Sequence, residues 1–551
     1  MAVDSEAPNG PISHTALAAA ISDGGYPTAV SDPESGSLAS KRRVKGPTDG
    51  EKAKISEDNA DSVLNVSIQE GTDHTHRRLK PRHIQLIGIG GTIGMAEMVT
   101  YLPISSPFIR FAGRYVDEAF GVAAGYNFFI FEAALVPFEV TACNLIINYW
   151  SDAVPVGGII AIVLVLYALL NLFAVKWYGE SEFWLAIGKV LLSVGLIVYT
   201  FITMVGGNPL GDRFGFRYWN NPGSFAEYYK EGHLGKWLGF LQCLIMASFT
   251  IAGPDYVSMA AGEAENPRKV MPKAFNAVFY RLTAFFVLGV LCVGILVPYN
   301  DPTMKAAFDQ GLPGAAASPY VVSMDRLHIP ILPHIVNAMI LTACFSAGNS
   351  YVYCASRSLY GLALEGKAPR VLAKCTGNGV PIYCVAIVLA IALLSFLQVS
   401  NSASVVLDWL VNLVTASQLI NYAVISFTFI RFKKAVDKQG ISRDSLPYRG
   451  RFQPFLAWYA LVGTFTMAFV GGYTVFLPGN WDIPTFFFSY TMIGVFPILF
   501  IGWKLIKRTE FKKPEDVDLR TGVADIDEYT RNYVPTPPRN AFVKVLNILL
   551  G

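Results

Sequence analysis

The chain has 551 residues, of which 52% are hydrophobic and 15% are charged, and its mean hydropathy is +0.39. This composition excludes a soluble globular protein, because too few charged residues remain to cover a water-exposed surface. A net charge of +3 gives no basis for nucleic-acid binding through bulk charge. We therefore expect an integral membrane protein that crosses the bilayer several times.

Residues 1–75 form a polar tail ahead of the first apolar run. They are rich in Ser, Asp, Gly, Pro and Ala and lack the periodicity of a helix or a strand, which predicts disorder. The tail also lacks the charged start, apolar core and cleavage site of a secretory signal peptide. We expect the membrane domain over 76–506 and a second polar tail over 507–551.

Ten apolar runs after Gly121 are long enough to cross a bilayer, which takes about 20 residues. We expect helices there over 121–149, 155–175, 183–205, 236–260, 275–299, 329–355, 380–398, 405–430, 455–477 and 485–506. Loops rich in Lys and Arg alternate with loops that carry neither, such as "QVSNSAS" at 398–404. Because basic loops stay in the cytosol, this alternation and the even count predict that both termini are cytosolic.

The stretch 84–103, "IQLIGIGGTIGMAEMVTYLP", is apolar and rich in glycine, yet it has basic residues on both sides. These are Arg77, Arg78, Lys80 and Arg82 before it and Arg110 and Arg114 after it. If this segment crossed the membrane once, one of these two groups of basic residues would lie outside the cell. We therefore expect this segment to enter and leave the membrane on the same side.

Four stretches of the chain resemble the fungal amino-acid permeases of the amino acid, polyamine and organocation superfamily. They are "RRLKPRHIQLIGIGGTIG" from Arg77, "AGEAENPRKVMPKAF" from Ala261, "ILPHIVNAMILTACFSAGNSYVYCASRSLYGLALEGKAP" from Ile331 and "FTFIRFKKAVDKQGISRDSLPYRG" from Phe427. The resemblance covers roughly residues 76–530. It implies an all-α, polytopic transporter fold in which ten helices form two inverted repeats of five and two further helices follow.

The resemblance also implies where substrate binds. Broken stretches of the first and sixth spans would expose backbone N–H and C=O groups to a carboxylate and an ammonium group at the bilayer midplane. Glycine is suited to such stretches because it lets the backbone approach a ligand closely. The substrate-binding candidates are therefore Gly88, Gly90, Gly91, Thr92, Gly94, Ala252, Gly253 and Asp255.

Two features depart from the family pattern. Family members continue after "GGTIG" with the rest of the first span, an external loop and most of the second span, whereas here Gly94 is followed directly by Met95. By the length rule about 30 residues are absent, so the first two spans are interpreted as truncated and fused over 84–103. In the sixth span, "GPD" at 253–255 replaces the usual Gly, any residue and Glu, which leaves room for carnitine or polyamine substrates.

Three ionisable residues within the apolar runs are candidates for proton coupling, because a charge inside a membrane is costly. Glu132 and Glu139 are seven residues apart and share a helix face; each is alternatively protonated or bonded to backbone opened by Pro137. Lys189 is close enough to the start of its run to snorkel, although a lysine of the fifth span acts in coupling in parts of the superfamily. Asn349 is a further substrate-binding candidate, with interhelical packing as its alternative.

No pattern in the sequence favours an enzyme. The stretch "GIGGTIG" does not match the dinucleotide-binding spacing GxGxxG, and it enters a membrane instead of following a strand. The seven cysteines lie mostly in apolar runs without a CxxC pair, which predicts neither a metal site nor a disulfide framework. We expect no cofactor, with the proton as the coupling ion.

These observations predict a secondary active transporter that imports amino acids or related amines by proton symport. The family's usual location is the plasma membrane. The expected partners are a small amino acid or amine and the lipid bilayer, without nucleic acid, and the sequence sets no oligomeric state. Three alternatives stay open: a carnitine or polyamine permease, a nutrient sensor that does not transport, and an inactive product of a splice variant or faulty gene model.

Overall fold

The structure is a computed structural model that describes residues 93–533, apart from 105–106, 152, 174, 251–257, 259–260, 262–263, 265, 310–317, 377–378, 402 and 451. The regular secondary structure of these residues is helical, as the sequence predicted, and no β-strand occurs among them. The expected tail over 1–75 and the last part of the expected tail over 507–551 lie outside the described residues.

Within the described part of the chain, seven helical segments are long and apolar enough to cross a membrane. They belong to helices α6 (Glu118–Ile147), α7 (Val156–Phe173), α8 (Val175–Met204), α14 (Leu332–Leu364), α15 (Ile382–Ala392) with its continuation η5 (Leu393–Val399), α16 (Ala403–Lys438) and α18 (Ile483–Lys507). Two shorter apolar segments occur in α11 (Pro267–Leu296) and α17 (Phe455–Val470). Together with α9 (Gly232–Thr250), these helices overlap the ten apolar runs of the sequence, with ends that differ by several residues.

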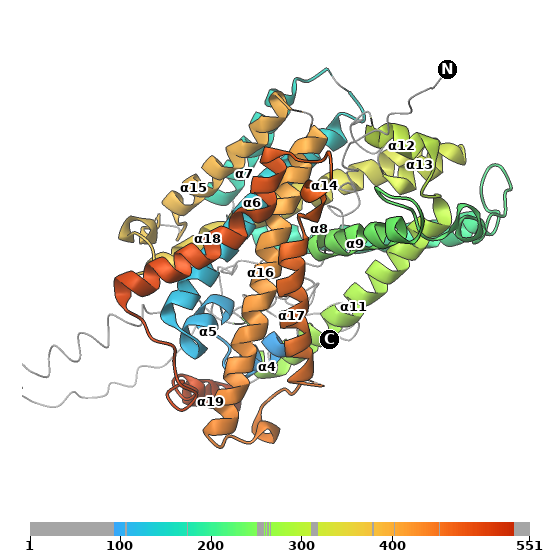
Figure 1. The fold of residues 1–551 in the computed structure, drawn as a ribbon. Coiled ribbons are helices and arrows are strands. Elements are labelled where there is room, and N and C mark those ends of the chain that lie inside the picture. The colour runs from blue at the N-terminus through green and yellow to red at the C-terminus, as the bar shows by residue number, and fades with distance from the viewer. Residues whose placement is uncertain are drawn as a thin grey trace, which may run out of the picture.

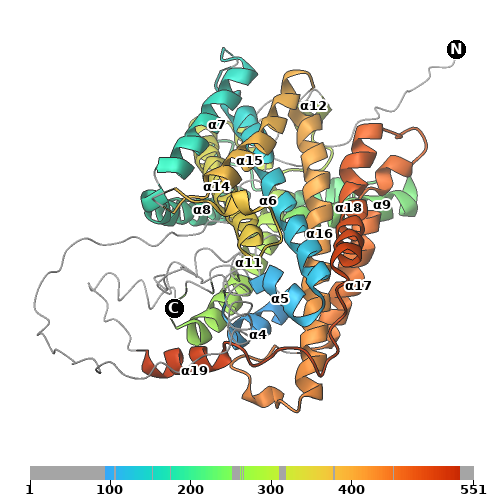
Figure 2. The ribbon, with the colours of Figure 1, turned by 90° about the vertical axis from the view of Figure 1, so that its left-hand side faces the viewer.

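Helix α6 lies at the centre of the bundle, with α14 and α16 packed against it (Figures 1 and 2). Of its apolar window 83% is buried, against 11% for the peripheral α18. Asp117 caps the N-terminus of α6 by accepting a hydrogen bond from the Ala119 N–H at 3.0 Å. The carboxylate of Asp117 also pairs with Lys504 at the end of α18, which joins the central helix to the periphery.

Two short helices precede α6 at one end of the bundle: α4 (Ile93–Tyr101) and α5 (Pro107–Tyr115) (Figures 1 and 2). The nine described residues of α4 extend about 14 Å, and Ile93, the first of them, is also the first residue that the structure describes. The junction of Gly94 and Met95 lies inside α4. Of the expected fused segment 84–103, residues 84–92 lie outside the described part.

A pair of glycines lets α5 pack directly on α6. A Cβ atom built on Gly121 would come within 2.7 Å of the Gly113 Cα, which real side chains do not tolerate. The two backbones are therefore in close contact, and any larger residue at position 121 would force them apart.

The segment 508–532, which follows α18, packs against this same end of the bundle, and we call it the docked tail. Arg114 of α5 holds it: the guanidinium donates hydrogen bonds to the carbonyl oxygens of Asp518 at 2.8 Å and Thr521 at 2.7 Å. It also forms an ion pair of 3.0 Å with the Asp518 carboxylate. Val517 and Leu519 are buried in the contact.

Three further elements contact the docked tail. The Tyr101 hydroxyl of α4 donates to the carbonyl of Leu519 at 2.9 Å, and the Gln439 amide after α16 donates to the carbonyl of Val517 at 2.7 Å. Arg268 in the first turn of α11 pairs with Asp527 in α19 (Val523–Asn532). The tail thus connects α4, α5, α11 and α16, which are far apart in the sequence.

The opposite end of the bundle carries the longer connections and two short helices, α12 (Pro302–Asp309) and α13 (Pro319–Arg326) (Figure 1). Asp301 and Arg326 form an ion pair of 3.4 Å, and the hydroxyls of Tyr199 and Ser323 hydrogen-bond at 3.0 Å. These contacts fix α13 to the bundle. The remaining described elements are single turns: η1 (Trp219–Gly223), η4 (Arg370–Ala373), η6 (Arg443–Ser445) and η7 (Tyr473–Phe476).

Candidate functional site

Three of the residues selected from the sequence, Glu139, Lys189 and Asn349, lie in one buried polar cluster inside the bundle. Four helices build it: α6, α7, α8 and α14. We call it the interior cluster, and its members are Glu139, Cys143, Tyr167, Asn171, Lys189, Cys344, Gly348 and Asn349.

Glu139 is the acidic member of the interior cluster. Its side chain is 0% exposed. The carboxyl interacts electrostatically with the thiol of Cys143 one turn further along α6, with the Tyr167 hydroxyl on α7 and with the Cys344 thiol on α14. Glu139 therefore has two thiols and a phenol as electrostatic neighbours, one from α6 itself and two from α7 and α14.

Lys189 is the basic member. It lies on α8, where it is 5% exposed, and its ammonium group interacts electrostatically with Cys344. Helix α8 begins at Val175, about four turns before Lys189, so the side chain does not sit at a helix end. Cys344 thus has an acid, Glu139, and a base, Lys189, as electrostatic neighbours.

The amides of Asn171 and Asn349 close the cluster on the side of α7 and α14. The Asn171 Nδ2 donates to the Asn349 Oδ1 at 2.8 Å and to the carbonyl of Tyr167 at 3.0 Å. Both side chains are buried. Asn349 therefore makes the kind of interhelical hydrogen bond that the packing interpretation expects.

Gly348 allows the helices to approach this closely. A Cβ atom at this position would clash with the Tyr167 hydroxyl, lie 2.8 Å from the Tyr167 Cζ and lie 3.0 Å from the Glu139 Cβ. Only hydrogen fits between α14, α6 and α7 here. The glycine is thus a structural requirement of the interior cluster.

The other selected residues do not join the cluster in the described part of the chain. Glu132 is fully buried on α6, seven residues or about 10 Å along the helix from Glu139. Gly94 is the second residue of α4. The remaining substrate-binding candidates lie outside the described residues: Gly88, Gly90, Gly91, Thr92, Ala252, Gly253 and Asp255.

Several polar residues of this architecture were not selected from the sequence. Tyr167 and Asn171 are spaced by one helical turn within an apolar run, and that spacing is a signal that could have identified them. Cys143 and Cys344 were interpreted as small core residues, and nothing in their spacing indicates that they face Glu139. Asp408, an acid in the apolar run of α16, was also passed over although the rule on intramembrane charges applies to it.

Within the described part of the chain, no group of three or more His, Cys, Asp or Glu side chains is placed to hold a metal ion. The interior cluster brings together a carboxyl, an amine, a phenol and two thiols.

The sequence model of the family described as amino acid permease matches residues 83–515. Among similar curated proteins is the general amino acid permease AGP2 of Saccharomyces cerevisiae, 44% identical over 83% of this chain and 84% of the relative. A proline-specific permease of Emericella nidulans is 39% identical over 88% of this chain and 94% of the relative. A lysine-specific permease of Saccharomyces cerevisiae is 36% identical over 82% and 80%.

Among solved structures, a manganese transporter of Eremococcus coleocola aligns with 83% of this chain and 97% of its own. The two share 11% of their residues, and the TM-score is 0.39.

Proposed function

The chain belongs to the amino acid permease family, and on that premise we propose that it is a secondary active transporter that imports amino acids. Matching relatives include permeases named as general, proline-specific and lysine-specific, so the substrate of this chain is an amino acid or a related amine. The seven apolar segments make the chain an integral, multi-pass membrane protein. We place it in the plasma membrane, with both termini and the docked tail in the cytosol.

The interior cluster supports proton symport as the source of energy. Transferring a charge from water into a bundle of apolar helices is costly, so the protonation of Glu139 depends on whether water reaches it. A transporter that alternately opens to each side changes this access. A carboxyl at the meeting point of α6, α7 and α14 is therefore suited to take up a proton on one side and release it on the other.

Lys189 completes the coupling. Its ammonium group and the Glu139 carboxyl have the Cys344 thiol as a common electrostatic neighbour, and Coulomb attraction between opposite charges is strong in a medium of low dielectric constant. Protonation of Glu139 would remove that attraction and free α8 to move relative to α6. Coupling requires such a link between the protonation of Glu139 and the position of α8 relative to α6.

The Glu139→Gln variant tests the proposal, since it keeps the shape of the side chain and removes its proton. In reconstituted vesicles we expect proton-gradient-driven uptake of proline or lysine to fall by at least about tenfold, equivalent to about 1.4 kcal/mol. Exchange of labelled for unlabelled amino acid without a gradient should persist. Glu118→Gln, an exposed acid in the first turn of the same helix, is the matched control.

Two results would contradict the proposal. One is gradient-driven uptake by Glu139→Gln at the wild-type rate. The other is a wild-type protein that is folded and inserted but accumulates no amino acid, carnitine or polyamine under any proton gradient. Substrate-induced signalling without measurable flux would then favour a sensor.

A second proposal concerns the junction of Gly94 and Met95. The alignment with the general amino acid permease extends over 500 positions, whereas 83% of 551 residues is about 457, a difference of roughly 40 positions. The gap positions summed over this alignment leave room for an absent loop and two half-spans, which take about 30 residues. We propose that transcripts exist which encode an apolar run and a loop between these residues. Sequencing full-length transcripts tests this, and a direct Gly94–Met95 junction in all of them would refute it.

A further inference from the structure

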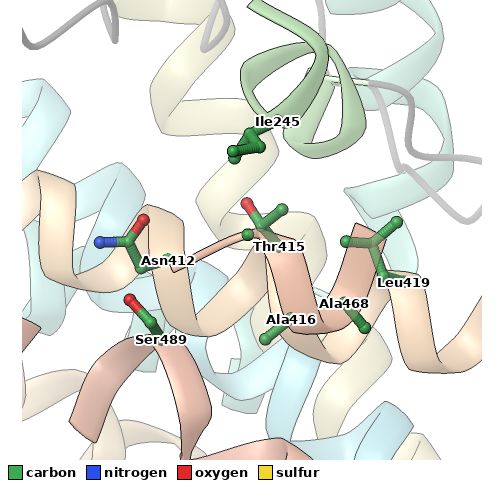
Figure 3. Close-up of a pocket in the computed structure, with 8 residues that line it drawn as sticks. Ile245, Asn412, Thr415, Ala416, Leu419, Ala468 and Ser489 are labelled. Carbon is green, nitrogen blue, oxygen red and sulfur yellow. The ribbon is translucent and has the colours of Figure 1, made fainter. Parts of the chain in front are cut away.

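A second polar site lies away from the interior cluster, in a partly open cavity between α9, α16, α17 and α18. The space free of atoms is about 230 Å³ with its open side included, and its enclosed part has room for about one water-sized group. Figure 3 shows Asn412 and Thr415 on α16, Ser489 on α18 and Ile245 on α9 around this space. None of these residues or helices contributes to the interior cluster, so the cavity needs an explanation of its own.

Ser489 is the first indication of a ligand. Its side chain is 4% exposed, lines the cavity, and its hydroxyl has no hydrogen-bond partner among the described residues. A buried hydroxyl without a partner costs free energy, and a bound polar group would remove that cost. The Thr415 hydroxyl donates to the carbonyl of Val411 at 2.6 Å, so only its oxygen lone pairs remain for the cavity.

Asp408 is an acidic residue one helical turn beyond the residues that line this cavity. It lies four residues, or one helical turn, before Asn412 in the membrane-spanning segment of α16, so the two side chains are neighbours on one helix face. The adjacent Trp409 stacks on Phe488 of α18, with ring centroids 5.5 Å apart and an interplanar angle of 3°. This contact holds the turn that carries Asp408 against the turn of α18 that carries Ser489.

We propose that this cavity binds the ammonium group of a small amine. The Asn412 carbonyl and the Thr415 and Ser489 oxygens can accept its hydrogen bonds, and the Asp408 carboxylate supplies the opposite charge. No Lys, Arg or His lines the cavity, and a carboxylate ligand would be repelled by Asp408. The enclosed part of the cavity is far smaller than the about 300–1,000 Å³ usual for larger ligands, so only the ammonium head of the amine enters it.

Binding of methylammonium chloride to the purified full-length protein tests this inference. The protein is placed in nanodiscs of phosphatidylglycerol, which has no ammonium group, and thermal unfolding is followed against sodium chloride of equal ionic strength. We expect a saturable rise of the unfolding temperature that sodium chloride does not cause. Asp408→Asn should weaken the affinity at least tenfold and Ser489→Ala a few-fold, while Asp437→Asn, an exposed acid near the other end of α16, should leave it unchanged.

A cavity-filling variant keeps the test decisive if Asp408→Asn fails to fold. Ala468→Leu places a larger side chain in the cavity from α17 and should abolish the effect without removing a charge. The inference is wrong if sodium chloride gives the same rise or if both variants respond like the wild type.

The site is also separable from the coupling site. Glu139→Gln should lose gradient-driven uptake yet keep the methylammonium response, and loss of that response would assign the probe to the interior cluster and overturn the inference. Nanodiscs that contain phosphatidylethanolamine distinguish the source of the ammonium group. If the methylammonium response is weaker in these nanodiscs, the lipid headgroup competes for the cavity and is its ligand. If the response is unchanged, the ligand is a free amine.

Discussion

The charged residues of the interior cluster and those around the docked tail belong to the same bundle but have different neighbours. At the tail end of the bundle, Glu97 of α4 pairs with Arg443 and accepts a hydrogen bond from the Gly450 N–H at 2.6 Å. Arg114 likewise binds both a carboxylate and two carbonyl oxygens. These ion pairs and hydrogen bonds are strong, and they hold the loops that contribute to them in place.

In the interior cluster, Glu139 instead lies among two thiols and a phenol, and Cys344 is also an electrostatic neighbour of Lys189. Groups of this kind accept either protonation state of the carboxyl more readily than an ion pair tied to backbone does. The comparison suggests that charges at the tail end stabilise the fold and that charges in the interior serve transport. Four variants test this division.

The largest loss of stability is expected for Glu97→Gln. The change leaves the partly buried Arg443 without its counter-charge, which should lower the free energy of unfolding by about 2–4 kcal/mol. Thermal unfolding of the purified protein measures this. The fraction that remains folded should still couple uptake to protons. Asp444→Asn, which breaks an exposed pair with Arg449, is the control and should change stability by no more than about 0.5 kcal/mol.

Gly348→Ala should lower stability and uptake together, because the new methyl group collides with Tyr167 in the interior cluster. We expect a cost of about 1–3 kcal/mol, as for other overpacked cores. Combining it with Tyr167→Phe removes the atom in closest contact and should restore part of both. Gly463→Ala on α17, where no atom lies within 4 Å of the new Cβ, should have no such effect. Full uptake by Gly348→Ala alone would show that the helices need not approach so closely.

Arg114→Ala should release the docked tail while leaving the interior cluster intact. The tail loses one ion pair and two charge-assisted hydrogen bonds, a cost of about 1–3 kcal/mol. Hydrogen exchange of residues 508–532 should become faster, with α6 and α14 unaffected. Arg217→Ala removes an exposed pair with Asp212 and serves as the control. Unchanged exchange in the tail would mean that its apolar contacts suffice to hold it.

Acidification should weaken the same contact slightly. Burial disfavours ionised Asp518, but hydrogen bonds from Thr521 and the nearby Arg114 guanidinium outweigh this and lower the pKa of its carboxyl. A lowered pKa means that ionised Asp518 contributes stability above the pKa of the unfolded chain, about 3.9, and that this contribution is lost as the pH falls through the lower folded value. The difference in unfolding temperature between wild type and Asp518→Asn should therefore shrink below about pH 4. The effect is small because the side chain is 43% exposed. A difference that is constant from pH 3 to 7 would exclude this role.

Much of the fold could be predicted from local sequence. A run of about 20 apolar residues is compatible with few structures besides a membrane helix, and the helices overlap the ten runs. The same reasoning selected Glu139 and Lys189, because an ionisable residue in such a run is conspicuous wherever it packs. The end of α4 at Tyr101 likewise follows from the Pro103 that ends the apolar stretch.

The partners of these residues could not be predicted in the same way. Arg443 meets Glu97 across 346 positions of sequence, and Asn349 meets Asn171 across 178. Nothing in the sequence of α14 indicates that Gly348, and not another small residue, faces Tyr167. Ser489 and Asn412 look like ordinary small polar residues until the packing of α16 and α18 places them around one cavity.

The sequence by itself thus determined that the chain is a membrane protein, where its apolar helices lie and which ionisable residues are buried with them. These properties follow from hydropathy and helix geometry, which act over a few turns of chain. Only the tertiary structure decided which charges share a neighbour, which pair across the bundle and where a cavity remains. Such contacts depend on how whole helices pack side by side, and their energies are set by distance and burial, which the order of residues along the chain does not specify.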